Sequence, residues 1–135
     1  MALASVAVFN SPAAHAASCG GAVGYPGDAA TTVEVANWMA NGAIAKKLPG
    51  ELPVMAGLVE SGLRNLNYGD ADSVGFFQMR TSFWDKAPYK GYLKNPDLQL
   101  QWFTDQAAAV RSNYIAKGKG DPATSDATYG VWIAD

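Results

Sequence analysis

The amino-acid sequence predicts a mainly α-helical domain with a minor β component, in the mainly α or α+β class. With 49% hydrophobic and 16% charged residues, the composition is that of a chain able to bury a core. Three stretches carry apolar residues at the spacing of helices. A fourth, long stretch follows neither helical nor strand spacing and is rich in aromatic residues.

The folded part is predicted to begin at residue 31. Thr31 and Glu34 match a capping box, in which each side chain bonds to the other residue's backbone N–H at a helix start. Pro49 and Gly50 break this first helix. Its apolar positions at helical spacing are Val35, Trp38, Met39, Gly42 and Ala43.

A second helix is predicted after that break, with Pro53 tolerated in its first turn. Gly62 and Asn65 are residues that favour a helix end. The apolar residues predicted to share one buried face are Leu52, Met55, Ala56, Val59 and Leu63.

Residues 65–92 are predicted as a long irregular loop or a small β-hairpin. Long irregular stretches are usually functional or disordered, and the many aromatic residues here argue against disorder. A third, long helix begins at Asn95-Pro96 and ends before Gly118, and Ser125 is predicted to cap a short last helix through Trp132. The predicted buried face of the third helix is Leu100, Phe103, Ala107, Val110 and Tyr114.

Residues 1–30 are predicted to be a leader and a Gly-rich linker, and residues 31–135 the domain. An apolar run followed by Ala14-His15-Ala16 is typical of a secretory signal peptide, but the basic segment that normally precedes such a run is missing. A signal-peptide remnant and a flexible Ala-rich leader both remain open. The helical pattern is still running at Asp135, which leaves open a truncation of the domain.

Composition excludes several classes of function. The net charge is −2 and no basic stripe is visible, so we expect no nucleic-acid partner. One histidine, His15, and one cysteine, Cys19, cannot supply the three or four ligands of a His-Cys metal cage, and we expect neither a metal nor a cofactor. No stretch approaches the length of a membrane span. Catalysis would have to rest on carboxylates, hydroxyls, amides or the substrate itself.

Glu60 is the one glutamate of three without a structural explanation. Glu34 belongs to the capping box, and Glu51 sits at a helix start, where a carboxylate is favoured. Glu60 lies beside the apolar stripe near a helix C-terminus. Partial desolvation and the helix dipole there both favour the protonated form, as a general acid requires. The alternative is an exposed ion pair with Arg64, four residues on.

Two motifs decide between these interpretations. Residues 60–67 read Glu-Ser-Gly-Leu-Arg-Asn-Leu-Asn, and residues 72–79 read Asp-Ser-Val-Gly-Phe-Phe-Gln-Met. The pair resembles the lysozyme-like lytic transglycosylase domain, in which a helix ends in Glu-Ser and a loop with a serine and a Gly-Leu-Met-Gln-type turn follows. The resemblance covers residues 33–132 and extends to actinobacterial and phage-associated cell-wall enzymes.

The resemblance implies a lysozyme-like fold with helices around a cleft, and cleavage of peptidoglycan between N-acetylmuramic acid and N-acetylglucosamine. It makes Glu60 the catalytic acid and Ser61, Ser73 and Gln78 substrate-binding residues. Ser73 would face the acetamido group, and Gln78 would line the sugar groove. Tyr129 would also contact substrate.

The C-terminal half of the resemblance is looser. Where the family has an Ala-Tyr-Asn segment, this sequence reads Ala127-Thr128-Tyr129-Gly130, so the asparagine is absent. Gln99 stands where an Asp-Pro-x-x-Asn stretch of the family has its asparagine.

Three functions follow as hypotheses. In a lytic transglycosylase Glu60 acts as acid and then as base. A goose-type-like hydrolytic lysozyme would add a second carboxylate about 6.5–9.5 Å away, for which Asp70 and Asp72 are candidates, although both are also typical turn residues. A non-catalytic glycan-binding or phage-tail-like structural module would instead use aromatic residues such as Trp84 and Trp102. We expect a monomer that binds peptidoglycan strands outside the cell, in the envelope or on a phage particle.

Overall fold

The computed structural model describes residues 24–124 and Trp132. Within them the chain forms four α-helices, one 3-10 helix and one two-stranded sheet, which agrees with the mainly α or α+β class. The elements in chain order are α1 (Thr32–Ala45), α2 (Glu51–Ser61), β1 (Ser73–Val74), β2 (Met79–Arg80), α3 (Thr81–Trp84), η1 (Tyr92–Lys94) and α4 (Pro96–Ala116).

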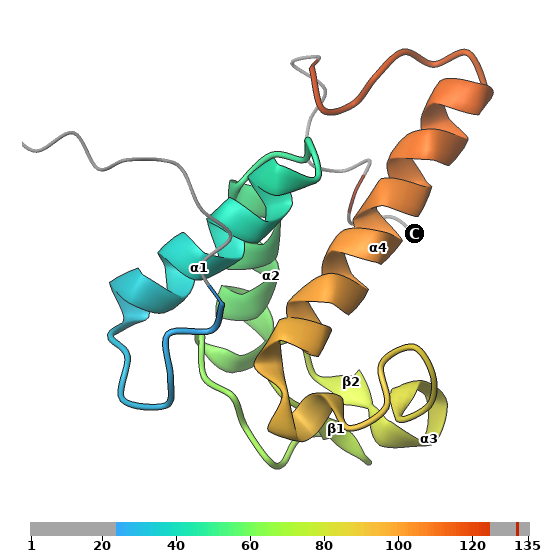
Figure 1. Ribbon diagram of the computed structural model, residues 1–135. Coiled ribbons are helices and arrows are strands. Elements are labelled where there is room, and N and C mark those ends of the chain that lie inside the picture. The colour runs from blue at the N-terminus through green and yellow to red at the C-terminus, as the bar shows by residue number, and fades with distance from the viewer. Residues whose placement is uncertain (1–23, 125–131, 133–135) are drawn as a thin grey trace, which may run out of the picture.

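Helices α1 and α2 pack side by side, and α4 runs past both of them (Figure 1). The hairpin and α3 lie at the end of the molecule where α2 ends and α4 begins (Figure 1). Residues 62–95 therefore form a cap at the end of α2 and the start of α4. Among the described residues, no helix is both long and apolar enough to cross a bilayer.

Helix α1 begins with the predicted capping box. The Thr31 hydroxyl oxygen accepts a hydrogen bond from the Glu34 N–H at 3.3 Å, and the Glu34 carboxylate accepts one from the Thr31 N–H at 2.8 Å. Both bonds satisfy backbone donors that a helix start leaves unpaired. The predicted residues Val35, Trp38 and Met39 are buried, and Ala43 follows them one turn later.

Helix α2 ends at Gly62, which takes the left-handed conformation (φ 64°) predicted for a glycine C-cap. Its predicted buried face is wrong in part. Leu52 is buried, but Met55 is 40% exposed and Val59 is 84% exposed. In the described structure α1 and α4 pack against other positions of α2, so Met55 and Val59 remain exposed to solvent.

The hairpin predicted as an alternative to an irregular loop is present. Its two short antiparallel strands pair Ser73 with Arg80 and Val74 with Met79. Two further elements, α3 and η1, were not predicted. Helix α3 begins because Asp72, before the hairpin turn, accepts a hydrogen bond from the Ser82 N–H at 2.6 Å.

Helix α4 begins at Pro96, as predicted, but Asn95 makes no side-chain capping bond. Leu100 and Ala107 of the predicted face are buried, whereas its other members are half-buried. Two polar residues that apolar periodicity cannot indicate, Gln99 and Thr104, are among the most deeply buried side chains of the molecule.

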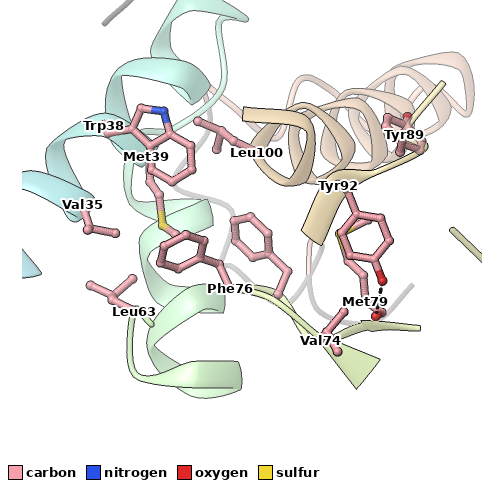
Figure 2. Close-up of a cluster of buried hydrophobic side chains, with 11 residues drawn as sticks. Val35, Trp38, Met39, Leu63, Val74, Phe76, Met79, Tyr89, Tyr92 and Leu100 are labelled. Atoms are coloured by element: carbon pink, nitrogen blue, oxygen red, sulfur yellow. Dashed lines mark hydrogen bonds between the residues drawn. The ribbon is translucent and has the colours of Figure 1, made fainter. Parts of the chain in front are cut away.

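The core lies where α1, α4 and the hairpin cap meet, and Phe76 stands at its centre (Figure 2). The Phe76 ring packs against Trp38 and Tyr25, with ring centroids 5.6 and 5.8 Å apart. Tyr25 and Ala30, which precede the predicted start of the domain at residue 31, also pack against this core. The buried core residues are Val35, Trp38, Met39, Leu63, Val74, Phe76, Phe77, Met79, Tyr89, Tyr92 and Leu100.

Candidate functional site

Glu60 lies in the last turn of α2, next to the residue at which the helix ends. Its side chain is exposed, and this corrects the expectation of a partly desolvated carboxylate. The expectation depended on a covered apolar stripe, and the neighbouring Val59 is itself open to solvent. The alternative ion pair is not formed either. Within the described residues no salt bridge joins Glu60 to Arg64, whose Nε instead donates to the Ser61 carbonyl at 3.4 Å.

Glu60 borders an apolar hollow of about 280 Å³ between α2 and α4. The described residues that line this hollow with Glu60 are all apolar or aromatic, so the carboxylate is its one charged group among them. They are Leu52, Met55, Ala56, Val59, Phe103 and Trp132. Ser73 and Gln78 do not line it, because they lie on the cap beyond the end of α2.

Ser61 connects the end of α2 to the cap through a side-chain hydrogen bond. Its side chain is buried, and its hydroxyl contacts the carbonyl oxygens of Phe76 at 2.8 Å and Gly57 at 3.1 Å. The same hydroxyl oxygen accepts a hydrogen bond from the Arg64 N–H at 3.3 Å. The structure therefore gives Ser61 a set of partners inside the protein, and the contact with Phe76 links the helix that carries Glu60 to the turn that carries Gln78.

Gln78 occupies the end of that turn in an uncommon backbone conformation. Its φ is 48°, in the left-handed region that residues other than glycine rarely adopt. Its Nε2 donates to the carbonyl oxygens of Tyr68 and Gly75, both at 3.2 Å. A Cβ at Gly69 would collide with the Gln78 carboxamide, so the chain approaches this side chain closely. Such strained positions concentrate at functional sites.

Ser73 and Asp70 occupy one turn of the same cap. The Ser73 N–H donates to the Asp70 carbonyl at 3.0 Å, and Ser73 is buried in β1. Asp70 is exposed. Ser73 therefore lies in the strand before the turn that carries Gln78, and its side chain is not open to solvent.

Asp72, the other candidate for a second carboxylate, accepts hydrogen bonds from three residues. Its two oxygens accept hydrogen bonds from Arg80 Nε at 2.6 Å, Thr81 Oγ1 at 3.0 Å and the Ser82 N–H at 2.6 Å. The Ser82 backbone bond and the Arg80 guanidinium hold the pKa of Asp72 well below its usual range. These contacts are those of a turn and capping residue, the alternative that the sequence left open.

Gln99 joins the candidate site to α4 and was not predicted as a site residue. It is fully buried, and its Oε1 accepts a hydrogen bond from the Phe76 N–H at 2.7 Å. Its Nε2 donates to Asn65 Oδ1 at 2.9 Å and to the Tyr92 carbonyl at 3.1 Å. The one available signal was its position where the family that the sequence resembles has an asparagine. The predicted site residue Tyr129 lies outside the described residues.

The aromatic residues of the cap belong mainly to the core. Tyr89 and Tyr92 are buried, and the Tyr92 hydroxyl donates to the Met79 carbonyl at 2.7 Å (Figure 2). Burial raises the pKa of Tyr92 to about 12. Trp84 and Trp102 are half-buried and pack edge to face, 5.3 Å apart. These contacts favour a packing role for most of the aromatic residues over a sugar-stacking surface.

Glu60 is an exposed carboxylate in the last turn of α2, and the Ser61 hydrogen bond to Phe76 joins that helix end to the turn of Gln78, whose amide bonds to the Tyr68 and Gly75 carbonyls. In residues 24–124 no three histidine, cysteine, aspartate or glutamate side chains gather in a way that could hold a metal ion. No protein-family model, curated protein sequence or solved structure matches this chain.

Proposed function

We propose that the protein is a lysozyme-like enzyme that cleaves the β-1,4 bond between N-acetylmuramic acid and N-acetylglucosamine in peptidoglycan, as a lytic transglycosylase. One observation carries the proposal. The hydrogen bond from Ser61 to the Phe76 carbonyl joins the two motifs of the resemblance, and so brings Glu60 and Gln78 to the same end of the molecule. The substrate implies that the protein acts outside the cell, in the envelope or on a phage particle.

In the proposed reaction Glu60 is the only essential carboxylate. Protonated Glu60 donates its proton to the bridging oxygen as the bond from that oxygen to C1 of the muramic acid breaks. The N-acetyl group of the same sugar stabilises the positive charge that develops at C1. The Glu60 carboxylate then takes the proton of the 6-hydroxyl, whose oxygen bonds to C1 and closes a 1,6-anhydro ring. No water is consumed, and Glu60 ends protonated again.

The contacts of Asp72 support this route over the hydrolytic alternative. A carboxylate that Arg80 and the Ser82 N–H hold in its charged form is a poor general base, because protonation disrupts those bonds. A goose-type-like hydrolytic lysozyme would therefore have to use Asp70, which is exposed. The chemistry of the product separates the two reactions.

The test compares purified wild type with Glu60→Gln on peptidoglycan suspensions. The variant keeps the shape of the side chain and removes the proton donor, so we expect the rate of turbidity loss to fall by a factor on the order of 10²–10⁴. Glu34→Gln is the matched control, because glutamine also completes a capping box and should leave the rate unchanged. Equal clearing by wild type and Glu60→Gln would remove Glu60 as the acid.

Mass spectrometry of the released muropeptides identifies the reaction. A transglycosylase releases products with a 1,6-anhydro ring that are one water lighter than the products of hydrolysis. Products heavier than the anhydro products by one water would show hydrolysis and would make Asp70 the candidate for the second carboxylate. Wild type that binds peptidoglycan without releasing any fragment would favour the non-catalytic binding module.

A further inference from the structure

We propose that Gln99 is a positioning residue that sets where the turn Gly75-Phe76-Phe77-Gln78 lies against the end of α2. The inference rests on the proposed function for its effect on catalysis, but its structural part stands on contacts of its own. Gln99 would not touch substrate. It would act through Phe76, whose carbonyl binds Ser61, the residue after Glu60, and which precedes Gln78 by two residues.

Both the oxygen and the nitrogen of the Gln99 carboxamide form hydrogen bonds inside the protein. Its oxygen accepts from the Phe76 N–H, and its nitrogen donates to Asn65 Oδ1 and to the Tyr92 carbonyl. The side chain is 0% exposed. One amide on α4 thus joins three segments of the cap: the residues after α2, the turn after β1 and the start of η1.

Phe76 is held by two side chains that come from different helices. Gln99 of α4 binds its N–H at 2.7 Å, and Ser61 of α2 binds its carbonyl at 2.8 Å. Ser61 directly follows Glu60 in the chain, and Gln78 follows Phe76 by two residues. Both hydrogen bonds end on the backbone of Phe76, so together they fix the position of the turn. Without the Gln99 bond, the turn can shift relative to Glu60.

Gly75 keeps the space that Gln99 needs. Its φ is 88°, and a Cβ on Gly75 would collide with the Gln99 carboxamide. The close fit explains the choice of side chain. Methionine has a similar length but neither donates nor accepts as an amide does, and asparagine carries the same amide on a stem one methylene shorter.

The alternative is that Gln99 contributes only to stability, as any buried polar residue with satisfied bonds does. Thr104 on the same helix provides the comparison. It is 1% exposed, and within residues 24–124 its hydroxyl contacts only the Leu100 and Gln101 carbonyls of its own helix, at 2.9 and 3.1 Å. Thr104→Val is therefore a matched control that removes buried hydrogen bonds within α4 and leaves the hydrogen bonds of the cap in place.

The kinetic experiment measures kcat and KM on soluble peptidoglycan strands for wild type, Gln99→Met and Thr104→Val, each corrected for its folded fraction. We expect Gln99→Met to lower kcat by about tenfold or more with little change in KM, since a shift of about 1 Å at a reacting group can cost about a hundredfold. Thr104→Val should keep the wild-type kcat. A folded Gln99→Met with the kcat of Thr104→Val would overturn the proposal. If Gln99→Met does not fold, Gln99→Asn takes its place, with an intermediate loss expected.

A double-mutant cycle adds a readout that a purely structural role would not change. Ser61→Ala and Gln99→Met each remove one hydrogen bond to the Phe76 backbone. Because both act on the same residue, the combined fold-loss of kcat should be smaller than the product of the two single fold-losses. Ser61→Ala with Thr104→Val should give the simple product. Multiplicative losses in the first pair would contradict a shared action through Phe76.

Amide hydrogen exchange separates failure of this inference from failure of the proposed function. In Gln99→Met the amides of residues 75–78 should exchange faster than in wild type, and in Thr104→Val they should not. If wild type cleaves no peptidoglycan, the proposed function fails, and this exchange difference alone decides whether Gln99 positions the turn. Unchanged exchange in Gln99→Met would overturn the positioning role whatever the activity.

Discussion

At the scale of single residues, Asp72 is the carboxylate of the cap with the largest set of partners. Arg80, Thr81 and Ser82 all donate to it, and these bonds favour the charged form of the carboxylate in the folded protein. Its folded pKa is therefore lower than the unfolded value of about 3.9. A lowered folded pKa stabilises the fold above the unfolded pKa, and this stabilisation is lost as pH falls through the folded pKa.

Asp72→Asn should lower the melting temperature at neutral pH, and the difference from wild type should depend on pH. We expect the full difference above about pH 5, where aspartate is charged in both folded and unfolded chains. The difference should shrink below about pH 4 and disappear in strong acid. Thermal melts from pH 2 to pH 7 provide the measurement, with Asp70→Asn as the exposed control. A difference that is constant across this range would contradict the proposed role of the charge.

The residues of the candidate site were predictable to different degrees. Glu60 could be found because no capping or dipole role explained it, and Gln78 because it lies 18 residues further on in a recognisable motif. The exposure of Glu60 could not be predicted, since it depends on which elements cover α2. Gln99 could not be assigned a role either, because its three partners lie 7 to 34 residues away and meet only in the fold.

At the scale of elements, two of the three local signals at helix ends formed the bonds or backbone conformation predicted, and Asn95 did not. The capping box at Thr31 and the left-handed Gly62 depend on neighbouring residues only, and both are present in the structure. The buried face of α2 depends on distant elements, and its prediction was wrong at Met55 and Val59. Helix α3 was missed because Asp72, whose carboxylate accepts from its Ser82 N–H, precedes the helix by nine residues and reaches it across the hairpin.

The cap of α1 gives a prediction at this scale. Thr31→Ala removes the hydroxyl oxygen that accepts from the Glu34 N–H, so we expect the free energy of unfolding to fall by about 1 kcal/mol. Thr32→Ala is the matched control: this exposed neighbour lies inside the helix, and the change should stay within about 0.5 kcal/mol. Urea denaturation followed by circular dichroism measures both. Equal effects of the two substitutions would mean that the capping bond contributes nothing.

At the scale of the whole molecule, Phe76 makes the candidate site and the core a single unit. Its ring packs on Trp38 and Tyr25 in the core, while its backbone N–H and carbonyl bind Gln99 and Ser61. Site loops on a rigid scaffold often open locally at little cost. Here the turn that carries Gln78 cannot separate from the end of α2 without withdrawing a buried aromatic ring.

This coupling predicts that the Phe76 amide opens only when the whole protein unfolds. In native-state hydrogen exchange its opening free energy should match that of the Met39 amide in α1 and approach the global value, on the order of 5–15 kcal/mol for a protein domain. The control is the Gly91 amide, which binds the Asp85 carboxylate at an exposed position and should exchange much faster. Low concentrations of denaturant should change the exchange rates of Phe76 and Met39 in parallel. If Phe76 exchanged as fast as Gly91, the turn would open independently of the core, and the proposed catalysis by Glu60 would then depend on a local equilibrium in place of a fixed geometry.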